Sequence, residues 1–212
     1  MLRWSNLKNN KVVIIIMGVI IVLLIAVVVF LLVRDNNEVN SDNNQVVTDA
    51  AKFAEEYPAV AEDNVFVYTD VDKIIDTLEN GTGVVYLGFP ECQWCDQYVV
   101  YLNEVAKENG ISEIHYYNIR EDRSNNTDNY LKIVSLLEEY LEDDEEGNPR
   151  VYVPAVIFMN NGEIVGCDDE TSLDTEGAST PSEYWTDEKV NALKDRLNSY
   201  IDKSNVCVDC NS

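Results

Sequence analysis

The sequence contains one histidine and only 15 lysine and arginine residues, against 39 aspartate and glutamate residues. With His115 as the single histidine, a histidine-rich metal site or a Ser-His-Asp triad is hard to assemble. The chain also lacks a basic stripe, and an acidic surface repels the phosphates of a nucleic acid. We therefore expect no nucleic-acid partner and no metal, and we interpret His115 as a structural residue within a strand.

Charged residues are absent from positions 12–33, a run of 22 residues that reads VVIIIMGVIIVLLIAVVVFLLV. Such a run is long enough to cross the roughly 30 Å hydrocarbon core of a membrane as a helix. A cleaved signal peptide is the alternative, but its apolar segment is shorter and ends at a small-residue cleavage site, which is lacking here. Three bases precede the run and Arg34 alone follows it. This asymmetry predicts a single-pass membrane protein with a cytoplasmic N-terminus and an extracellular domain.

Composition divides the chain into five parts. They are a cytoplasmic N-terminus (1–11), a transmembrane helix (12–33), a linker with an N-terminal extension (34–64), a folded domain (65–203) and a tail (204–212). The 178 residues after Arg34 contain 11 bases and 39 acids, a formal net charge of −28. We attribute this charge to solubility.

The segment FPECQWC, residues 89–95, places Cys92 and Cys95 three positions apart. It follows the apolar run 84–87 and begins an amphipathic helix predicted over 92–109. The N-terminus of a helix favours a thiolate over a thiol, and only a thiolate attacks a disulfide. The sequence thus predicts a redox centre in which Cys92 is the exposed nucleophile and Cys95 the buried, resolving thiol.

Hydrophobic periodicity predicts an α/β protein with the element order β-α-β-α-β-α-β-β-α, a mixed central sheet and helices on both faces. The predicted elements are strand 65–68, helix 71–80, strand 84–87, helix 92–109, strand 114–119, helix 130–141, strands 155–159 and 163–167, and helix 187–203. A short helix is expected after Asp49. Asn161-Gly162 predicts the hairpin turn. Polar loops are expected over 120–128 and 168–184.

This order, with the C-x-x-C motif at the end of the second strand, resembles the thioredoxin fold over nearly the whole external domain. Pro154, just before the hairpin strand, matches the proline that is cis and lies against the redox disulfide in that family. The resemblance implies that Val153 and Pro154 offer a backbone edge to an extended substrate peptide. The segments GFPECQWC and YYNIREDR narrow the resemblance to membrane-anchored thioredoxin-like proteins of Gram-positive bacteria, including bacteriocin-transport accessory proteins.

Several residues depart from the family pattern. Glu91 stands where thioredoxins have tryptophan, and Gln93-Trp94 replace Gly-Pro between the cysteines. Tyr86 and Tyr116 occupy the places of a buried aspartate and a lysine, so the proton shuttle is either missing or replaced by tyrosine hydroxyls. Trp94 either shields the dithiol and contacts a partner or simply packs against its neighbours. The acids Glu91 and Asp96 oppose the pKa-lowering effect of the helix terminus on Cys92.

Three further cysteines are Cys167, Cys207 and Cys210. The last two repeat the C-x-x-C spacing and have three possible interpretations: a local disulfide, an auxiliary redox relay to Cys92, or a soft-metal site shared with Cys167. The acidic runs 142–146 and 168–170 lack the spacing of a calcium loop, and we expect them to be solvated.

The resemblance implies a membrane-tethered thiol–disulfide oxidoreductase without a cofactor, acting on disulfides of exported proteins or peptides. Its electrons would pass to or from an unidentified membrane or extracellular partner. Two alternatives remain from the sequence. One is a copper-type, soft-metal binding module built on Cys92 and Cys95. The other is a non-catalytic accessory subunit that uses the fold as a docking surface.

Overall fold

The structure, a computed structural model, describes residues 48–170, 177 and 180–206. The predicted transmembrane helix over 12–33 and the tail cysteines Cys207 and Cys210 lie outside these ranges. Within them, no helix combines the length and the apolar character needed to span a membrane.

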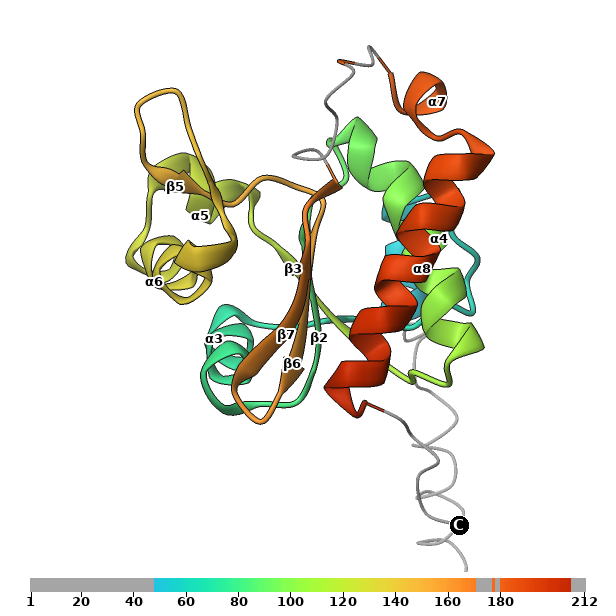
Figure 1. Ribbon diagram of the computed structural model, residues 1–212, viewed down its shortest axis with the longest axis horizontal. Helices are drawn as coiled ribbons and strands as arrows, with labels where there is room; N and C mark the ends of the chain where they lie inside the picture. Colours follow the sequence, from blue (N-terminus) through green and yellow to red (C-terminus); the bar gives the residue numbers. More distant parts are fainter. Residues whose placement is uncertain (1–47, 171–176, 178–179, 207–212) are drawn as a thin grey trace, which may run out of the picture. The chain divides into compact units, whose positions relative to one another are not determined.

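The described chain is an α/β unit built on a mixed five-stranded sheet with the strand order β1-β3-β2-β6-β7 (Figure 1). The strands are β1 (Phe66–Tyr68), β2 (Gly83–Gly88), β3 (Ile114–Asn118), β6 (Ala155–Asn160) and β7 (Glu163–Asp168). The first three run parallel to one another, β6 is antiparallel to β2, and β7 is antiparallel to β6. Every residue of β2 is buried, as expected for a central strand covered on both faces.

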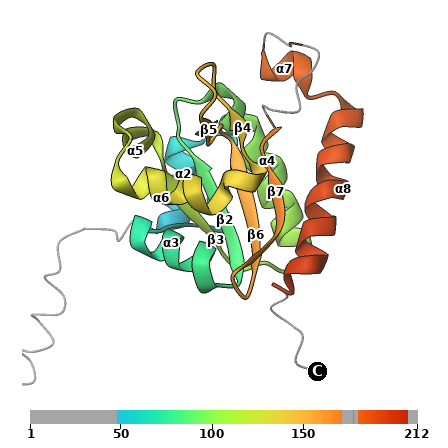
Figure 2. The same cartoon turned by 60° about the vertical axis from the view of Figure 1, so that its left-hand side comes forward.

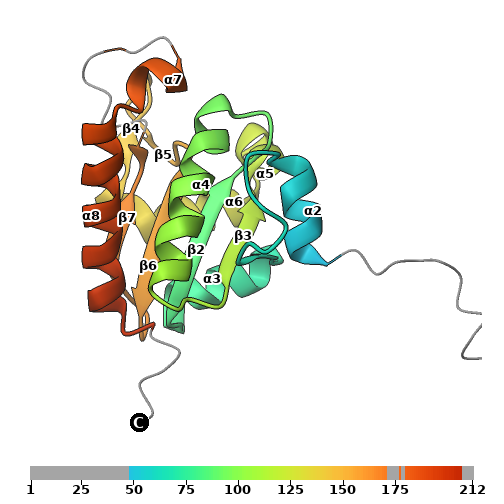
Figure 3. The same ribbon diagram turned by 90° about the vertical axis from the view of Figure 1, so that its right-hand side faces the viewer.

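Helices cover both faces of the sheet (Figures 1 and 3). The helices are α2 (Asp49–Glu56), α3 (Val71–Asn80), α4 (Gln93–Glu108), α5 (Arg120–Asn125), α6 (Asp128–Leu137), α7 (Pro181–Tyr184) and α8 (Asp187–Ser204). Helix α3 contacts α6 on one face, and α4 contacts α8 on the other. The predicted α/β class, with a mixed sheet and helices on both faces, is confirmed, and the predicted strands and helices occur in the expected order, with α5, the 3-10 turn Glu138–Tyr140, β4 (Glu142–Asp143), β5 (Pro149–Arg150) and α7 as additional elements.

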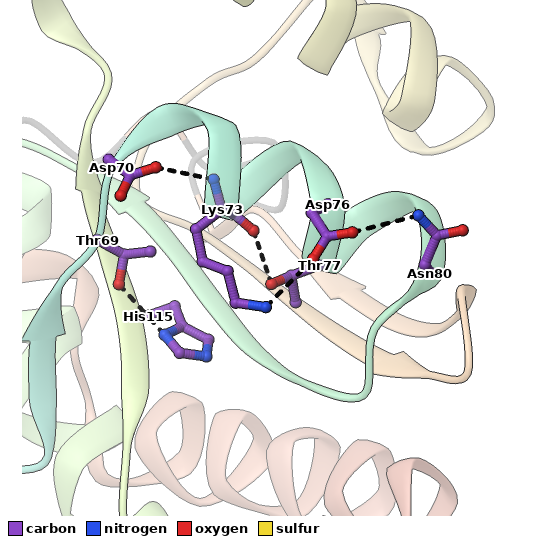
Figure 4. Close-up of polar contacts among 7 residues, drawn as sticks. All are labelled: Thr69, Asp70, Lys73, Asp76, Thr77, Asn80 and His115. Carbon is purple, nitrogen blue, oxygen red and sulfur yellow. Dashed lines mark hydrogen bonds and ion pairs between the residues drawn. The ribbon is translucent and has the colours of Figure 1, made fainter.

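Helix α3 shows how the local sequence sets the ends of an element (Figure 4). The Asp70 carboxylate accepts a hydrogen bond from the backbone N–H of Lys73 at 2.9 Å, which caps the helix as the sequence predicted. The helix ends at Gly81, and the Gly81 carbonyl accepts a hydrogen bond from Gly162 in the β6–β7 turn. Gly162 has a positive φ of 79°, and a side chain there would meet the backbone of α3. The predicted Asn-Gly hairpin therefore also anchors the sheet to α3.

Helix α2 belongs to the folded unit rather than to the predicted linker. Its residue Phe53 and the following Tyr57 are fully buried, and the Phe53 ring stacks on Phe66 of β1 with centroids 4.0 Å apart. The Asp49 carboxylate accepts a hydrogen bond from the backbone of Tyr68. The compact unit consequently begins near Val47, before the boundary predicted at residue 65.

The segment 120–128, expected to be a loop, contains α5. The Asn118 side chain accepts a hydrogen bond from the N–H of Arg120 at the start of this helix, and two acids occupy its first turn. Asn126 ends it in the left-handed conformation, with φ of 46°. Because α5 buries no residue, it has no apolar periodicity for sequence analysis to detect.

The acidic stretches also differ from expectation. Residues Glu142–Asp143 (β4) and Pro149–Arg150 (β5) form a small hairpin (Figure 2). Asp168 and Glu170, expected to be solvated, are each 3% exposed. Arg196 of α8 donates hydrogen bonds to Asp168 at 2.8 Å and to Glu170 at 2.6 Å. Asp168, Glu170 and the residues of α7 therefore do not lie in a polar loop as predicted, while positions 171–176 and 178–179 of that predicted loop lie outside the described residues.

Candidate active site

Cys92 occupies the N-cap position of α4, directly after the turn that leaves β2. Its Sγ accepts a hydrogen bond from the backbone N–H of Cys95 at 3.3 Å. A serine, threonine or aspartate oxygen usually makes this bond, so here the sulfur takes the place of a capping oxygen. The unpaired N–H groups and the partial positive charge at a helix N-terminus favour an anion at this position.

The surroundings of Cys92 lower the pKa of its thiol. The largest cause is the hydrogen bond from the Cys95 thiol, followed by the backbone N–H groups of Cys95 and Trp94 and the positive charge of Arg123. Partial burial acts in the opposite direction, since Cys92, predicted to be exposed, is half-buried. The net effect increases the fraction of thiolate at neutral pH.

Cys95 lies one turn further along α4 and is 0% exposed. Burial raises the pKa of its thiol far above the ordinary value, and the neighbouring Cys92 raises it further. The pKa is thus lowered at Cys92 and raised at Cys95, so Cys92 is the more easily ionised of the two thiols. Neither is in a disulfide in this structure.

The Val153–Pro154 peptide bond is cis, in agreement with the expectation for Pro154. The Cys92 thiol donates a weak hydrogen bond to the Val153 carbonyl at 3.6 Å, so this segment lies directly against the reactive sulfur. Two neighbours hold it in place: Val151 N–H donates to the Tyr130 hydroxyl at 3.3 Å, and Arg123 donates to the Val151 carbonyl at 3.2 Å. Helices α5 and α6 therefore position the chain that faces Cys92.

An open cleft of about 390 Å³ surrounds the Cys92 sulfur. Its lining residues are Phe89, Glu91, Cys92, Gln93, Trp94, Arg123, Arg150, Tyr152 and Val153. Trp94 is half-buried, and its ring meets Tyr184 of α7 edge-on with centroids 5.4 Å apart. The structure thus supports both interpretations of Trp94, because the residue packs against a neighbour and also lines the cleft.

Tyrosines stand behind the buried thiol, where the sequence predicted them. Tyr86 lies beside Cys95, and burial raises the pKa of Tyr86 far above its ordinary value. Its hydroxyl fits over Gly88, and the Tyr86 side chain interacts with the Cys95 thiol. The Tyr116 hydroxyl bonds to that of Tyr57, at 3.4 Å. The structure therefore places a protonated hydroxyl, rather than a carboxylate, next to Cys95.

The sequence drew attention to the acids near Cys92 but not to the bases. Glu91 forms an ion pair with Arg120 of α5, which offsets its charge. Burial raises the pKa of Asp96. Arg123, which contributes to the lowered pKa of Cys92, had no role in the sequence analysis although it lies in the segment YYNIREDR. Its position beside Cys92 depends on α5, and this helix was not predicted.

The remaining candidates lie away from the cleft. His115 is in β3, where its Nδ1 is 3.2 Å from the Thr69 hydroxyl (Figure 4), and burial lowers its pKa. Its interpretation as a structural residue is supported. Cys167 is a free thiol in β7, and burial raises its pKa to about 12. Within the described ranges, no three Cys, His, Asp or Glu side chains are grouped closely enough to hold a metal ion.

Two comparisons of the sequence with known proteins found no match. No protein-family model matches the chain, and no curated protein matches its sequence.

Proposed function

We propose that this protein is a thiol–disulfide oxidoreductase of the thioredoxin-like superfamily, anchored by residues 12–33 with its folded unit outside the cell. The observation that carries this proposal is the asymmetric dithiol: a half-buried Cys92 with a lowered pKa caps the helix that buries Cys95. The strand order, the helices on both faces and the cis Val153–Pro154 bond support the thioredoxin-like fold.

The proposed exchange proceeds in two steps. The Cys92 thiolate attacks one sulfur of a substrate disulfide, which forms a mixed disulfide and releases the other substrate sulfur as a thiolate. Cys95 then gives its proton to that departing thiolate and attacks the Cys92 sulfur. The protein disulfide forms, and both substrate sulfurs leave as thiols after a second proton is taken from water. Two electrons pass from the protein to the substrate, and the reverse sequence oxidises a substrate dithiol.

The buried position of Cys95 suits it to the second step. Its high pKa prevents it from competing with Cys92 for the substrate, because only a thiolate attacks. Once Cys92 is in a mixed disulfide, its negative charge is gone and one cause of the raised Cys95 pKa disappears. The direction of net electron flow depends on the reduction potential of the partner that recharges the pair.

Replacement of Cys95 by serine in the full-length chain tests this proposal. Without the resolving thiol, Cys92 should accumulate mixed disulfides that are visible on non-reducing gels and lost with dithiothreitol. The variants C92S and C95S should both lose insulin reduction. C167S is the matched control and should retain it, and a C207S/C210S variant measures the part played by the tail. If C95S traps no partner and the intact protein does not reduce insulin, the enzymatic proposal fails.

A further inference from the structure

Two arginines line the cleft beside Cys92, and no carboxylate of the described residues forms an ion pair with either of them. Arg123 and Arg150 both line this cleft, although the chain has 39 acids and only 15 lysines and arginines. Neither forms an ion pair with a carboxylate in residues 48–170, 177 or 180–206. By contrast, Arg120 pairs with Glu91 and Lys132 with Glu79. In so acidic a chain, two neighbouring guanidinium groups without ion pairs call for an explanation.

Arg123 is held firmly by contacts other than ion pairs. One of its N–H groups donates to the Val151 carbonyl at 3.2 Å, and its guanidinium carbon lies 5.0 Å from the centre of the Phe89 ring. The Val151 bond uses only one of the five N–H donors of a guanidinium group. The chain thus fixes the direction of this side chain without neutralising its charge.

Arg150 approaches the cleft from the β4–β5 hairpin. Its guanidinium carbon is 5.8 Å from the Tyr152 ring. Burial lowers the pKa of Arg123, and repulsion from the nearby charge of Arg150 lowers it further. The charge of Arg150 also lowers the pKa of Asp144 from a distance, without an ion pair between them. Bringing two cations together is unfavourable unless an anion binds between or beside them.

A carboxylate is the anion that best fits this arrangement. Guanidinium groups bind carboxylates through two parallel N–H···O bonds, and such bonds are strongest where water is partly excluded. Glu91, the acid that lines the same cleft, is already engaged by Arg120. Because no carboxylate in residues 48–170, 177 or 180–206 pairs with either arginine, a fitting ligand is an external carboxylate that reaches the cleft while Cys92 attacks.

We propose that Arg123 and Arg150 form a carboxylate subsite, which binds an acidic group next to the disulfide that Cys92 attacks. This inference rests on the proposed exchange reaction and specifies its substrate class. The acidic group is either an aspartate or glutamate beside a half-cystine of a peptide, or the carboxylate of a small disulfide. In both cases the subsite selects a substrate that the acidic surface around it would otherwise repel.

The test compares matched disulfides in single-turnover reactions with the reduced, full-length chain. Residues Cys167, Cys207 and Cys210 are replaced by serine so that only the dithiol reacts. One pair of probes consists of peptide disulfides that carry aspartate or asparagine beside the half-cystine. The other pair consists of 3,3′-dithiodipropionate and the neutral bis(2-hydroxyethyl) disulfide. The measured quantity is the ratio of the rate constants for the acidic and the neutral probe, which cancels general changes in Cys92 reactivity.

We expect this ratio to be about tenfold higher in the parent protein than in the R123Q/R150Q variant, because two charge-assisted bonds are lost. The matched control K132Q removes the same type of charge on α6 and should leave the ratio unchanged. Added salt should lower the ratio in the parent protein and in K132Q but not in R123Q/R150Q. An effect in both probe pairs shows that a carboxylate alone suffices, and an effect in the peptides alone assigns the subsite to peptide substrates.

Two outcomes overturn the inference, and they are distinguishable. If all probes react but the ratio is the same in the parent and in R123Q/R150Q, the carboxylate subsite is wrong and the exchange reaction stands. If no probe oxidises the dithiol, the proposed function itself fails, and the subsite fails with it.

Discussion

The molecule contains two regions that are each centred on an arginine, Arg196 or Arg123, and the two arginines differ in the partners that surround them. Around Arg196, two buried carboxylates and two tyrosine hydroxyls satisfy every charge: Tyr98 donates to Asp168, and Tyr184 donates to Glu170. Around Arg123, the partners are a backbone carbonyl, an aromatic ring and the Cys92 sulfur. Both guanidinium groups are partly buried, so burial alone does not distinguish them.

The difference lies in what each charge can still act upon. The ion pairs of Arg196 connect β7 to α8, and the opposite charges within this cluster neutralise one another. The charge of Arg123 contributes to the lowered pKa of Cys92, and Arg123 lines the cleft in which we propose that a carboxylate binds. We infer that Arg196, with its ion pairs, stabilises the fold, and we propose that Arg123, without one among the described residues, tunes the reactivity of Cys92. The following substitutions test this contrast, beginning with the largest expected effect.

Replacing Arg196 by methionine should lower the free energy of unfolding by about 3 kcal/mol, because it leaves two buried carboxylates without a cation. Urea denaturation at pH 8 measures this loss. The matched control is K194M on the same helix, where Lys194 makes a more exposed pair with Glu104 at 2.7 Å, and its cost should stay below about 1 kcal/mol. Equal stability of R196M and the parent would show that Asp168 and Glu170 are solvated after all.

Replacing Arg123 by glutamine should cost about 1 kcal/mol, since one charge-assisted hydrogen bond to the Val151 carbonyl is weakened at a half-buried position. Its main effect is on chemistry. Loss of the positive charge should raise the pKa of Cys92, so that thiolate absorbance near 240 nm develops at higher pH and alkylation at neutral pH slows. R123K, which keeps the charge, should restore part of the shift. An unchanged Cys92 titration in R123Q would contradict the assigned role.

The free energy of unfolding should depend on pH because the Glu170 carboxyl titrates at a different pH in the folded and in the unfolded chain. Burial raises the pKa of this carboxyl from 4.5 to about 7 in the folded protein. As pH rises from 4.5 to about 7, the unfolded chain releases the Glu170 proton before the folded chain does. The free energy of unfolding therefore falls over this pH range. The decrease should be about 3 kcal/mol relative to E170Q, in which the titrating group is absent. Parallel pH profiles of the two proteins from pH 4.5 to 7.5 would exclude the raised pKa.

Sequence patterns predicted those parts of the protein in which a single element carries the signal. The apolar periodicity of β2 and α4 placed Cys92 at a helix start and Cys95 in the core, and Asn161-Gly162 gave the hairpin. The two arginine regions were not predicted for a physical reason. Each one joins segments far apart in the chain, and α5, which carries Arg123, is a short surface helix without an apolar face.

The same dependence on distant segments explains why the burial of Asp168 and Glu170 was not predicted. Asp168 and Glu170 lie in a stretch rich in acids, which is the usual composition of a solvated loop. Only the approach of Arg196 from α8 makes their burial possible, and no local pattern reports a partner 26 or 28 residues away. Phe53 is a similar case, because its burial depends on β1 and β3.

The smallest expected effect comes from Arg120, one turn before Arg123 on α5. Its pair with Glu91 is about half exposed on both sides, so R120Q should change the free energy of unfolding by less than about 0.5 kcal/mol. It should nevertheless raise the pKa of Cys92 slightly, because Glu91 would regain an uncompensated negative charge beside the thiolate. The double variant E91Q/R120Q should return the Cys92 titration to that of the parent. If R120Q instead raised the pKa of Cys92 as much as R123Q does, any nearby positive charge would have the same effect. The position of Arg123 in the cleft would then not explain the lowered pKa of Cys92.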